Sequence, residues 1–292
     1  MSDAMINTVV QGEDIYGVAA ITTTMVAEAQ RLHGASPTAT AALGRLLTGS
    51  ALMAALLKDD SHRVSLQVNC RGPVRRVLAE ADGRGCVRGY VGRPTADMPS
   101  RDGKLDVGGV VGKGVLHVLK EVGLPEPQTG AVPLVSGEIA EDLAAYFDQS
   151  EQIPSAVSLG VLVNAHYEVA AAGGFLIQFH ATIGDDLINH IEKALAKVPP
   201  ATTMIQAGYQ PVEMLQQALG SLPLDIVRHH TPLWYCGCSR ERVVRALIAI
   251  GANELRQLIA ENQDTEVKCE FCTTAYVFRP QELVHILDSA LT

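Results

Sequence analysis

Two closely spaced pairs of cysteines carry the chemistry that the sequence indicates most strongly. The first pair has the pattern Cys-x-Cys and the second the pattern Cys-x-x-Cys, and thirty residues lie between the pairs. Each pair can present two sulfurs from one short turn, and two such turns facing each other complete the tetrahedron of thiolates that zinc prefers. We therefore predict one zinc ion per chain, bound by Cys236, Cys238, Cys269 and Cys272.

The same thiols could also form a redox switch. Zinc keeps its sulfur ligands as thiolates, which is the form that oxidants attack. Oxidation of two thiols would remove two ligands at once, and a Cys-x-Cys disulfide closes a small, strained ring that is easily reduced again. Arg240, Arg242 and Lys268 lie beside the ligands in the sequence and favour negative sulfur. On spacing alone, however, an inert structural zinc is favoured over a switch.

The composition indicates a globular protein with a core of its own and excludes several other classes. The chain has 292 residues, of which 47% are hydrophobic and 19% charged, and its net charge is -9. An acidic chain is a poor sequence-independent binder of nucleic acid, because phosphates need clustered Lys and Arg. The glycine-rich stretch 108–114 fails as a phosphate loop because Gly114 follows its lysine where Ser or Thr is needed, so we interpret it as a bend. No local catalytic triad is visible either, and we expect no enzyme activity.

The N-terminal segment and the most apolar run of the chain indicate the cellular compartment. Residues 1–16 contain three acidic and no basic side chains, which is unlike a secretory signal. The run 38–57 is interrupted by Arg45 and two glycines, so we predict a buried helix rather than a membrane span. We expect a cytoplasmic protein, whose thiols stay reduced or bind metal. Cys70 and Cys86 are interpreted as small core residues.

Residues 1–181 are predicted to form an α+β domain with a mostly antiparallel sheet. The pattern begins with two helices, and strands of period two follow. A bulge is expected at Gly173-Gly174, because paired glycines weaken a strand. Helices are predicted at 21–33, 36–58 and 136–148, and strands at 64–70, 74–81, 86–91, 115–120, 157–164 and 167–181.

The rest of the chain is predicted to form a helical linker and a small domain. Residues 182–231 contain short amphipathic helices separated by prolines, which need a surface to pack on. They are either an ordinary connector or a detachable cover over an apolar surface. Residues 232–292 are predicted as the zinc-binding domain, with helices at 241–250, from 253 and at 281–291, and small strands around 267 and 276–278. About sixty residues make a marginal core, so a zinc contribution of about 10–16 kcal/mol should decide whether this domain folds.

The chain resembles the 33-kilodalton heat-shock protein family of redox-regulated chaperones. The resemblance covers nearly the whole sequence, includes the stretches 146–154 and 171–175, and is weakest in the linker. In the C-terminal part the matching residues are Cys236, Cys238, Ser239, Glu241, Arg242, Cys269, Cys272, Tyr276 and Phe278.

This resemblance implies an ATP-independent holdase that is inactive while reduced and zinc-bound. Peroxide or hypochlorite with heat would then form the disulfides Cys236–Cys238 and Cys269–Cys272, release zinc and unfold the linker. The exposed apolar surface would hold unfolding client proteins, and the active form would be a homodimer. No membrane partner and no nucleic acid are expected.

Two other classes remain open at this stage. A thiol-disulfide oxidoreductase would need a redox pair at a helix start on a βαβ scaffold. A zinc-ribbon nucleic-acid-binding protein with a purely structural zinc would need a basic face and would bind RNA with a steep salt dependence. Some support for such a face comes from Arg228, Arg240, Arg242, Arg245 and Lys268.

Overall fold

The structure, a computed structural model, describes residues 2–180 and 183–291. The chain divides into a first unit, Met1–Tyr235, and a second unit, Cys236–Thr292. The expected domain boundary at 181–182 lies outside the described residues, and the three-part division at residues 182 and 232 stays a prediction. All elements of the segment 182–231 that are described here belong to the first unit.

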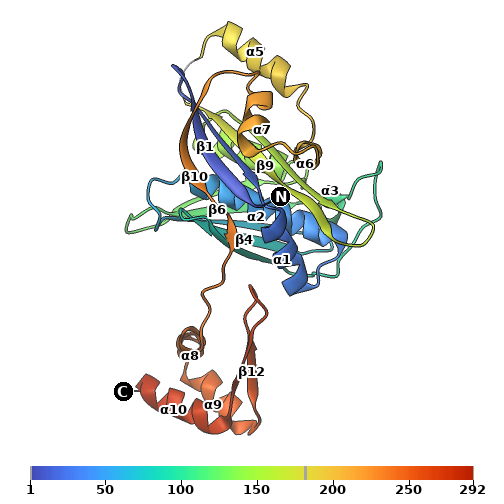
Figure 1. Ribbon diagram of the computed structural model, residues 1–292. Helices are drawn as coiled ribbons and strands as arrows, with labels where there is room; N and C mark the ends of the chain where they lie inside the picture. The colour runs from blue at the N-terminus through green and yellow to red at the C-terminus, as the bar shows by residue number, and fades with distance from the viewer. Residues whose placement is uncertain (1, 181–182, 292) are drawn as a thin grey trace. The chain divides into compact units, whose positions relative to one another are not determined.

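Two sheets form the framework of the first unit (Figure 1). All their neighbouring strands pair antiparallel except β11 with β5, which pair parallel. The first sheet has the order β10 (Leu224–His230), β1 (Ala4–Val10), β2 (Ile15–Ile21), β9 (Val169–Phe179) and β8 (Ser155–Val163). The second sheet has the order β11 (Leu233–Trp234), β5 (Cys86–Val91), β4 (Arg76–Asp82), β3 (Arg63–Cys70), β6 (Gly114–Glu121) and β7 (Gln128–Pro133).

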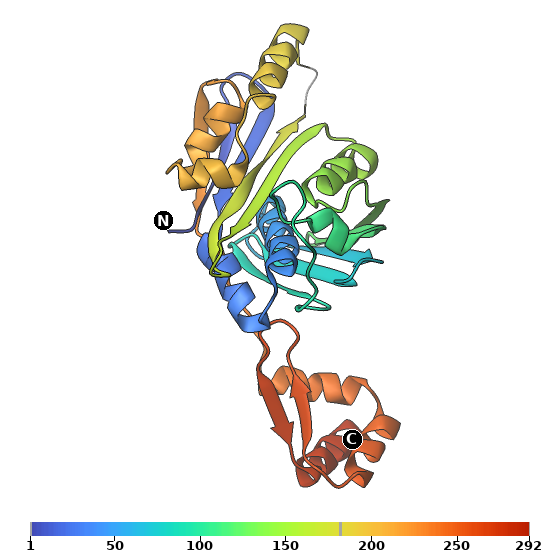
Figure 2. The same ribbon diagram turned by 90° about the vertical axis from the view of Figure 1, so that its right-hand side faces the viewer.

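Helix α2 (Pro37–Ala55) is the centre of the main hydrophobic core. It contacts both β4 and β8, so it lies between the two sheets, as Figure 2 shows in blue. Every residue from Thr38 to Ala55 except Arg45 is buried, which is the pattern of a helix with no solvent face. The predicted buried helix is therefore confirmed, and no helix among the described residues is long and apolar enough to cross a membrane.

The predicted signals at the ends of the first two helices are also confirmed. Helix α1 (Thr23–His33) ends at Gly34, which adopts the left-handed conformation with φ 58°. The Ser36 hydroxyl accepts a hydrogen bond from the Ala39 N–H and so caps the start of α2.

Helices α6 (Ala201–Gln206) and α7 (Pro211–Ala218) cover the outer face of the first sheet, and α5 (Asp185–Leu195) packs against α7 near the end of the sheet (Figure 1). A second hydrophobic cluster lies between the sheet and these helices, and α6 and α7 contribute the buried residues Met204, Ile205, Met214 and Leu215. The amphipathic helices predicted between 182 and 231 are thus present, and they lie on an apolar sheet face.

The α+β fold class is confirmed, but five strands and two helices were not predicted. The chain begins with β1 and β2, not with a helix, and β7, β10, β11 and α6 were not predicted either. The glycine-rich stretch contains α3 (Val107–Val111) instead of a bend, because the Asp106 side chain accepts a hydrogen bond from the Gly109 N–H and caps a short helix.

The predicted bulge at Gly173-Gly174 is wrong. Both glycines lie in regular pairing, and the register of β8 with β9 shifts between Leu162 and Val163 instead. A Cβ on Gly173 would lie 2.3 Å from the Ala20 carbonyl oxygen, and one on Gly174 would lie 2.1 Å from that of Ser158. These glycines are therefore needed because neighbouring backbones approach closely.

The helix expected from Ser136 begins later, as α4 (Ala140–Tyr146), and continues as a π-helical turn, η1 (Phe147–Glu151). The cause is the buried Asp142, whose carboxylate accepts hydrogen bonds from four backbone N–H groups of the preceding loop. The loop is thereby held in place before the helix starts.

The second unit contains three helices and a two-stranded sheet among its described residues. All five elements lie close to the predicted positions: α8 (Arg240–Ala249), α9 (Ala252–Ala260), β12 (Thr265–Lys268), β13 (Ala275–Phe278) and α10 (Pro280–Leu291). The Ser239 side chain caps α8 by accepting a hydrogen bond from the Arg242 N–H, as the sequence indicated.

Candidate metal centre

Two short turns of the second unit bring the four predicted ligands together. Cys236 and Cys238 immediately precede α8, whose start is fixed by the Ser239 cap. Cys269 and Cys272 lie in the connection between β12 and β13. This connection is closed by hydrogen bonds from the Cys269 N–H to the Thr274 carbonyl (2.9 Å) and from the Thr273 N–H to the Cys269 carbonyl (2.8 Å).

The four sulfur atoms form a cluster of the size that a zinc ion requires. All four Sγ atoms lie within 4.8 Å of one another. Cys236 and Cys269 are 3.7 Å apart, and Cys238 and Cys272 are 3.3 Å apart. A zinc ion with bonds of about 2.3 Å to four sulfurs would separate them by about 3.8 Å. Among the described residues this is the one cluster of three or more possible metal ligands.

The donor set also fits zinc chemically. Four thiolates and no carboxylate make a soft site, which selects zinc over the hard cations magnesium and calcium. The two remaining cysteines are not part of the cluster. Cys70 and Cys86 are half-buried residues of strands β3 and β5, and Cys70 packs against the main core as expected.

Two hydroxyl groups that sequence reasoning gave no role lie against the sulfurs. The Tyr276 hydroxyl donates a hydrogen bond to Cys238 Sγ over 3.1 Å, and Thr274 Oγ1 lies 3.2 Å from Cys272 Sγ. Both residues belong to the segment that leads from the second cysteine pair into β13. The signal was their position, two and four residues after Cys272, because such hydroxyls can reach the ligand turn of a hairpin.

These contacts give the thiols different acidities when no metal is bound. Burial raises the pKa of Cys236 to about 12 and also raises that of Cys238. At Cys272 the effect of burial is outweighed by hydrogen bonds from the side chain and backbone of Thr274, which lower its pKa to about 7.

Arg240, which begins α8 beside the first cysteine pair, has two further partners. Its guanidinium forms an ion pair with the Glu282 carboxylate at 2.7 Å and lies 4.2 Å from the centre of the Phe278 ring. The side chain therefore joins the start of α8 to β13 and α10.

Comparisons with known proteins agree over nearly the full length of the chain. The family model described as Hsp33 protein matches residues 3–279. A 33 kDa chaperonin of Geobacter sulfurreducens is 45% identical over 290 residues, which cover 99% of this chain and 96% of the relative. A 33 kDa chaperonin of Clostridium botulinum is 42% identical over 291 residues, which cover 99% of this chain and 98% of the relative.

A solved structure shows the same fold. The crystal structure of a 33 kDa chaperonin, a heat shock protein 33 homologue from Thermotoga maritima, superposes with a TM-score of 0.90 at 36% identity and covers 99% of both chains. The relatives are named as chaperones and not as enzymes. Sequence and structure together show that the chain belongs to the Hsp33 family of heat-shock chaperones.

Proposed function

We propose that this chain is a redox-regulated, ATP-independent holdase that is inactive while reduced and zinc-bound. It would protect thermally unfolding and oxidatively damaged proteins from aggregation after disulfides form and zinc is released. The observation that carries the proposal is the cluster of four sulfurs in a unit that has little else to hold it together. The nature of the family supports the chaperone activity itself.

The second unit depends on the metal because its own core is small. Of its described side chains, only six apolar ones are buried: Val243, Leu247, Leu255, Phe278, Leu283 and Ile286. A unit of about sixty residues with such a core is marginally stable. Bound zinc would hold Cys236, Cys238, Cys269 and Cys272 as thiolates and contribute about 10–16 kcal/mol to folding.

Oxidation of the ligands would remove this support. Hydrogen peroxide converts one thiolate of a pair to a sulfenic acid and is reduced to hydroxide. The second thiol of the pair then attacks the sulfenic sulfur, so a disulfide forms and water leaves. We propose Cys236–Cys238 and Cys269–Cys272 as the two disulfides, because membership of the Hsp33 family implies this pairing. The oxidised chain then has no thiolate left to bind the ion.

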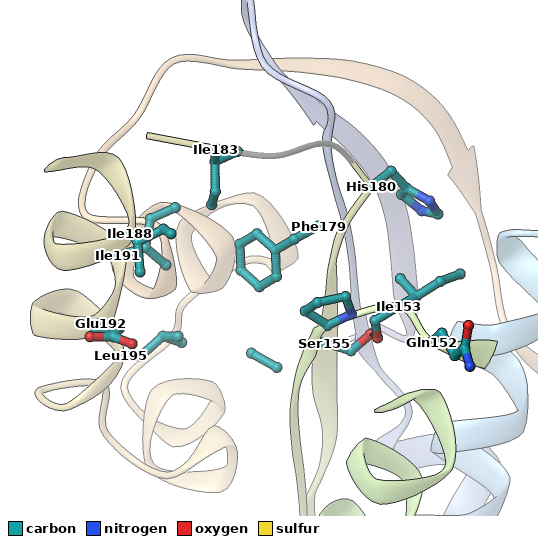
Figure 3. Close-up of a pocket in the computed structure, with 12 residues that line it drawn as sticks. Gln152, Ile153, Ser155, Phe179, His180, Ile183, Ile188, Ile191, Glu192 and Leu195 are labelled. Carbon is teal, nitrogen blue, oxygen red and sulfur yellow. Dashed lines mark hydrogen bonds between the residues drawn. The ribbon is translucent and has the colours of Figure 1, made fainter. Parts of the chain in front are cut away.

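The apolar surface that would be exposed lies beneath α5. A cavity of about 620 Å³ separates this helix from the ends of β8 and β9. Figure 3 shows Ile188, Ile191 and Leu195 of α5 on one side of the cavity and Phe179 and Ile153 on the other. Of the α5 residues only Ile191 is buried, so α5 is held less firmly than α6 and α7. The helix fits the role of a detachable cover better than that of a fixed connector.

The proposed partners follow from this surface. Unfolded or oxidatively damaged clients would bind through exposed apolar segments, and two oxidised copies would form a homodimer. We place the activity in the cytoplasm, where thiols remain reduced until oxidative stress begins.

The test compares zinc content and client aggregation before and after peroxide treatment at raised temperature. We expect the reduced protein to contain one zinc ion per chain and to leave aggregation unchanged. The oxidised protein should have lost the ion and should suppress aggregation. Oxidised, zinc-free protein that suppresses aggregation no better than reduced protein would refute the switch.

The nucleic-acid alternative is weakened by two ion pairs. Arg228 pairs with Asp60, and Arg240 pairs with Glu282, so two of the five cations that supported a basic face are partly neutralised. RNA binding whose affinity falls steeply with salt would restore this alternative.

A further inference from the structure

The edge of the second sheet is covered by its shortest strand. β11 contains two residues, Leu233 and Trp234, which pair parallel with Cys86 and Val87 of β5. The Leu233 N–H donates to the Gly85 carbonyl and the Tyr235 N–H donates to the Val87 carbonyl, each over 2.9 Å. The next residue along the chain is Cys236. The strand that covers this edge is therefore directly continuous with the first proposed zinc ligand.

The side chains of β11 hold it weakly. Leu233 is 44% exposed and Tyr235 is 55% exposed. Trp234 packs partly against the main core and meets the His33 ring edge-on at 6.1 Å between ring centres. On its other side, β11 borders an open groove of about 510 Å³ beside the start of α1. Two main-chain hydrogen bonds, the partly buried Trp234 and the buried Pro232 thus hold the cover in place.

The edge beneath β11 is shaped for an extended chain. Three carbonyl groups of β5 and the preceding turn accept hydrogen bonds along this edge: Gly85 from Leu233, Val87 from Tyr235, and Gly89 from His33 at 3.1 Å. Gly85 has φ 87°, and a Cβ there would lie 3.2 Å from the Thr231 carbonyl oxygen, so glycine permits the close approach of the covering segment. An exposed edge strand is a template for a further strand, and main-chain pairing does not depend on the sequence added.

We propose that the outer edge of β5 is a binding site for extended apolar segments of unfolded polypeptides, and that β11 occupies this site in the reduced protein. The segment Thr231–Tyr235, with the sequence TPLWY, shows the chemistry of the preferred ligand: an extended backbone with a large side chain placed against His33. The inference rests on the proposed redox switch, because unfolding of the second unit would free the C-terminal end of β11.

The first experiment opens the edge without oxidation. Leu233→Pro removes the N–H that binds Gly85 while leaving all four cysteines in place. We expect the reduced, zinc-loaded variant to bind an unfolded client about ten-fold more tightly than the reduced wild type. The matched control is Leu233→Ala, which keeps the N–H and should stay close to the wild type.

A peptide identifies the ligand directly. A synthetic peptide with the sequence of residues 229–235 should bind zinc-loaded Leu233→Pro and compete with the client. The same peptide with proline in place of Leu233 should not, because it lacks the N–H that binds Gly85. If Leu233→Pro forms dimers and binds neither peptide nor client, the edge serves a second copy of this chain and the proposal is wrong.

The second experiment closes the edge in the oxidised protein, and it decides the matter even if the proline variant folds poorly. Leu233 lies directly opposite Cys86, so Leu233→Cys allows a disulfide that locks β11 onto β5. We expect the locked protein to bind client several-fold more weakly after oxidation than the control Leu233→Cys/Cys86→Ser. Equal binding by the two would overturn the proposal.

The native tryptophan reports the release of β11. Trp234 is the chain's single tryptophan, so oxidation of the wild type should shift its emission to longer wavelength and increase quenching by acrylamide. An unchanged emission in oxidised, client-binding protein would contradict the release of the strand. Oxidised wild type that fails to hold client would instead refute the switch itself, whatever the Leu233 variants do.

Discussion

The two units of this chain are stabilised in different ways. The first has α2 buried between two sheets, and nearly every residue of that helix packs against apolar side chains. The second has a small core around Leu255 and Phe278, and four thiols at its start and its hairpin. Burial of apolar area stabilises the first unit whatever the redox state. We expect the second to be stable only while its thiols bind a metal, so the same oxidant should leave one unit folded and unfold the other.

Removal of the metal should show the difference in stability between the two units most clearly. We expect a chelator to abolish the slow amide hydrogen exchange of α8 and α9 and to leave that of α2 unchanged, because only the second unit loses about 10–16 kcal/mol of folding free energy. Hydrogen-exchange mass spectrometry measures both in one sample. Added zinc should restore protection. If α8 and α9 stay protected from hydrogen exchange without metal, the two units do not differ in how they are stabilised.

A ligand substitution should have the next largest effect. Cys238→Ser replaces a thiolate that also accepts the Tyr276 hydrogen bond, and it should reduce retained zinc from about one ion per chain to near zero against a competing chelator. Cys70→Ser is the matched control, since this half-buried thiol lies outside the cluster. The proposed ligand set is wrong if the two variants retain equal amounts of zinc.

A core substitution should affect the first unit alone. Leu46 of α2 is fully buried, and Leu46→Ala should lower the unfolding free energy of the first unit by about 2–5 kcal/mol. Zinc content should not change. Leu124→Ala, at a site that is 57% exposed, should have little effect in the same denaturant titration. Loss of zinc from Leu46→Ala would show that the units are not independent in stability.

The smallest expected effect is a change in how the stability of the first unit depends on pH. Burial, together with the nearby Arg228, lowers the pKa of His230 on β10, where Asp60 and His229 are the other charged or titratable neighbours. Below about pH 6.5 the unfolded chain therefore binds a proton that the folded chain resists, so stability is lost as pH falls. We expect His230→Gln to reduce the drop in the first unit's thermal midpoint between about pH 7.5 and about pH 5.5. His166→Gln, at an exposed turn, should leave the drop unchanged.

The two units also differ in how much of each the sequence predicted. In the second unit the caps, helices and small strands follow from local signals, such as Ser239 before α8. The thiol cluster was predicted equally well, because two closely spaced pairs of cysteines are the pattern that a tetrahedral zinc site needs. Tyr276 and Thr274 received no role, because a hydroxyl does not reveal from sequence alone which sulfur it will reach.

Part of the first unit was harder to predict because some of its strands pair over long sequence distances. β2 is nearly continuous in apolar residues, so it shows no alternation, and besides β1 it pairs with β9, which lies about 150 residues later in the chain. β10 was hidden for the same reason, since its partner is β1 at the other end of the unit. Local signals did predict α2 and the strands β3, β4, β5, β6, β8 and β9, most of which pair with a neighbour in the sequence.

The pairing of β1 with β10 has a consequence for synthesis. Val10 pairs with Leu224, so more than two hundred residues must be translated before this edge of the first sheet can close. At 5–20 residues per second that interval lasts roughly ten to forty seconds. Throughout that time the outer edge of β1 has no partner strand, and apolar side chains of the nascent chain stay exposed. While it is being synthesised, this chaperone is therefore itself an unfolded polypeptide of the kind that its family protects.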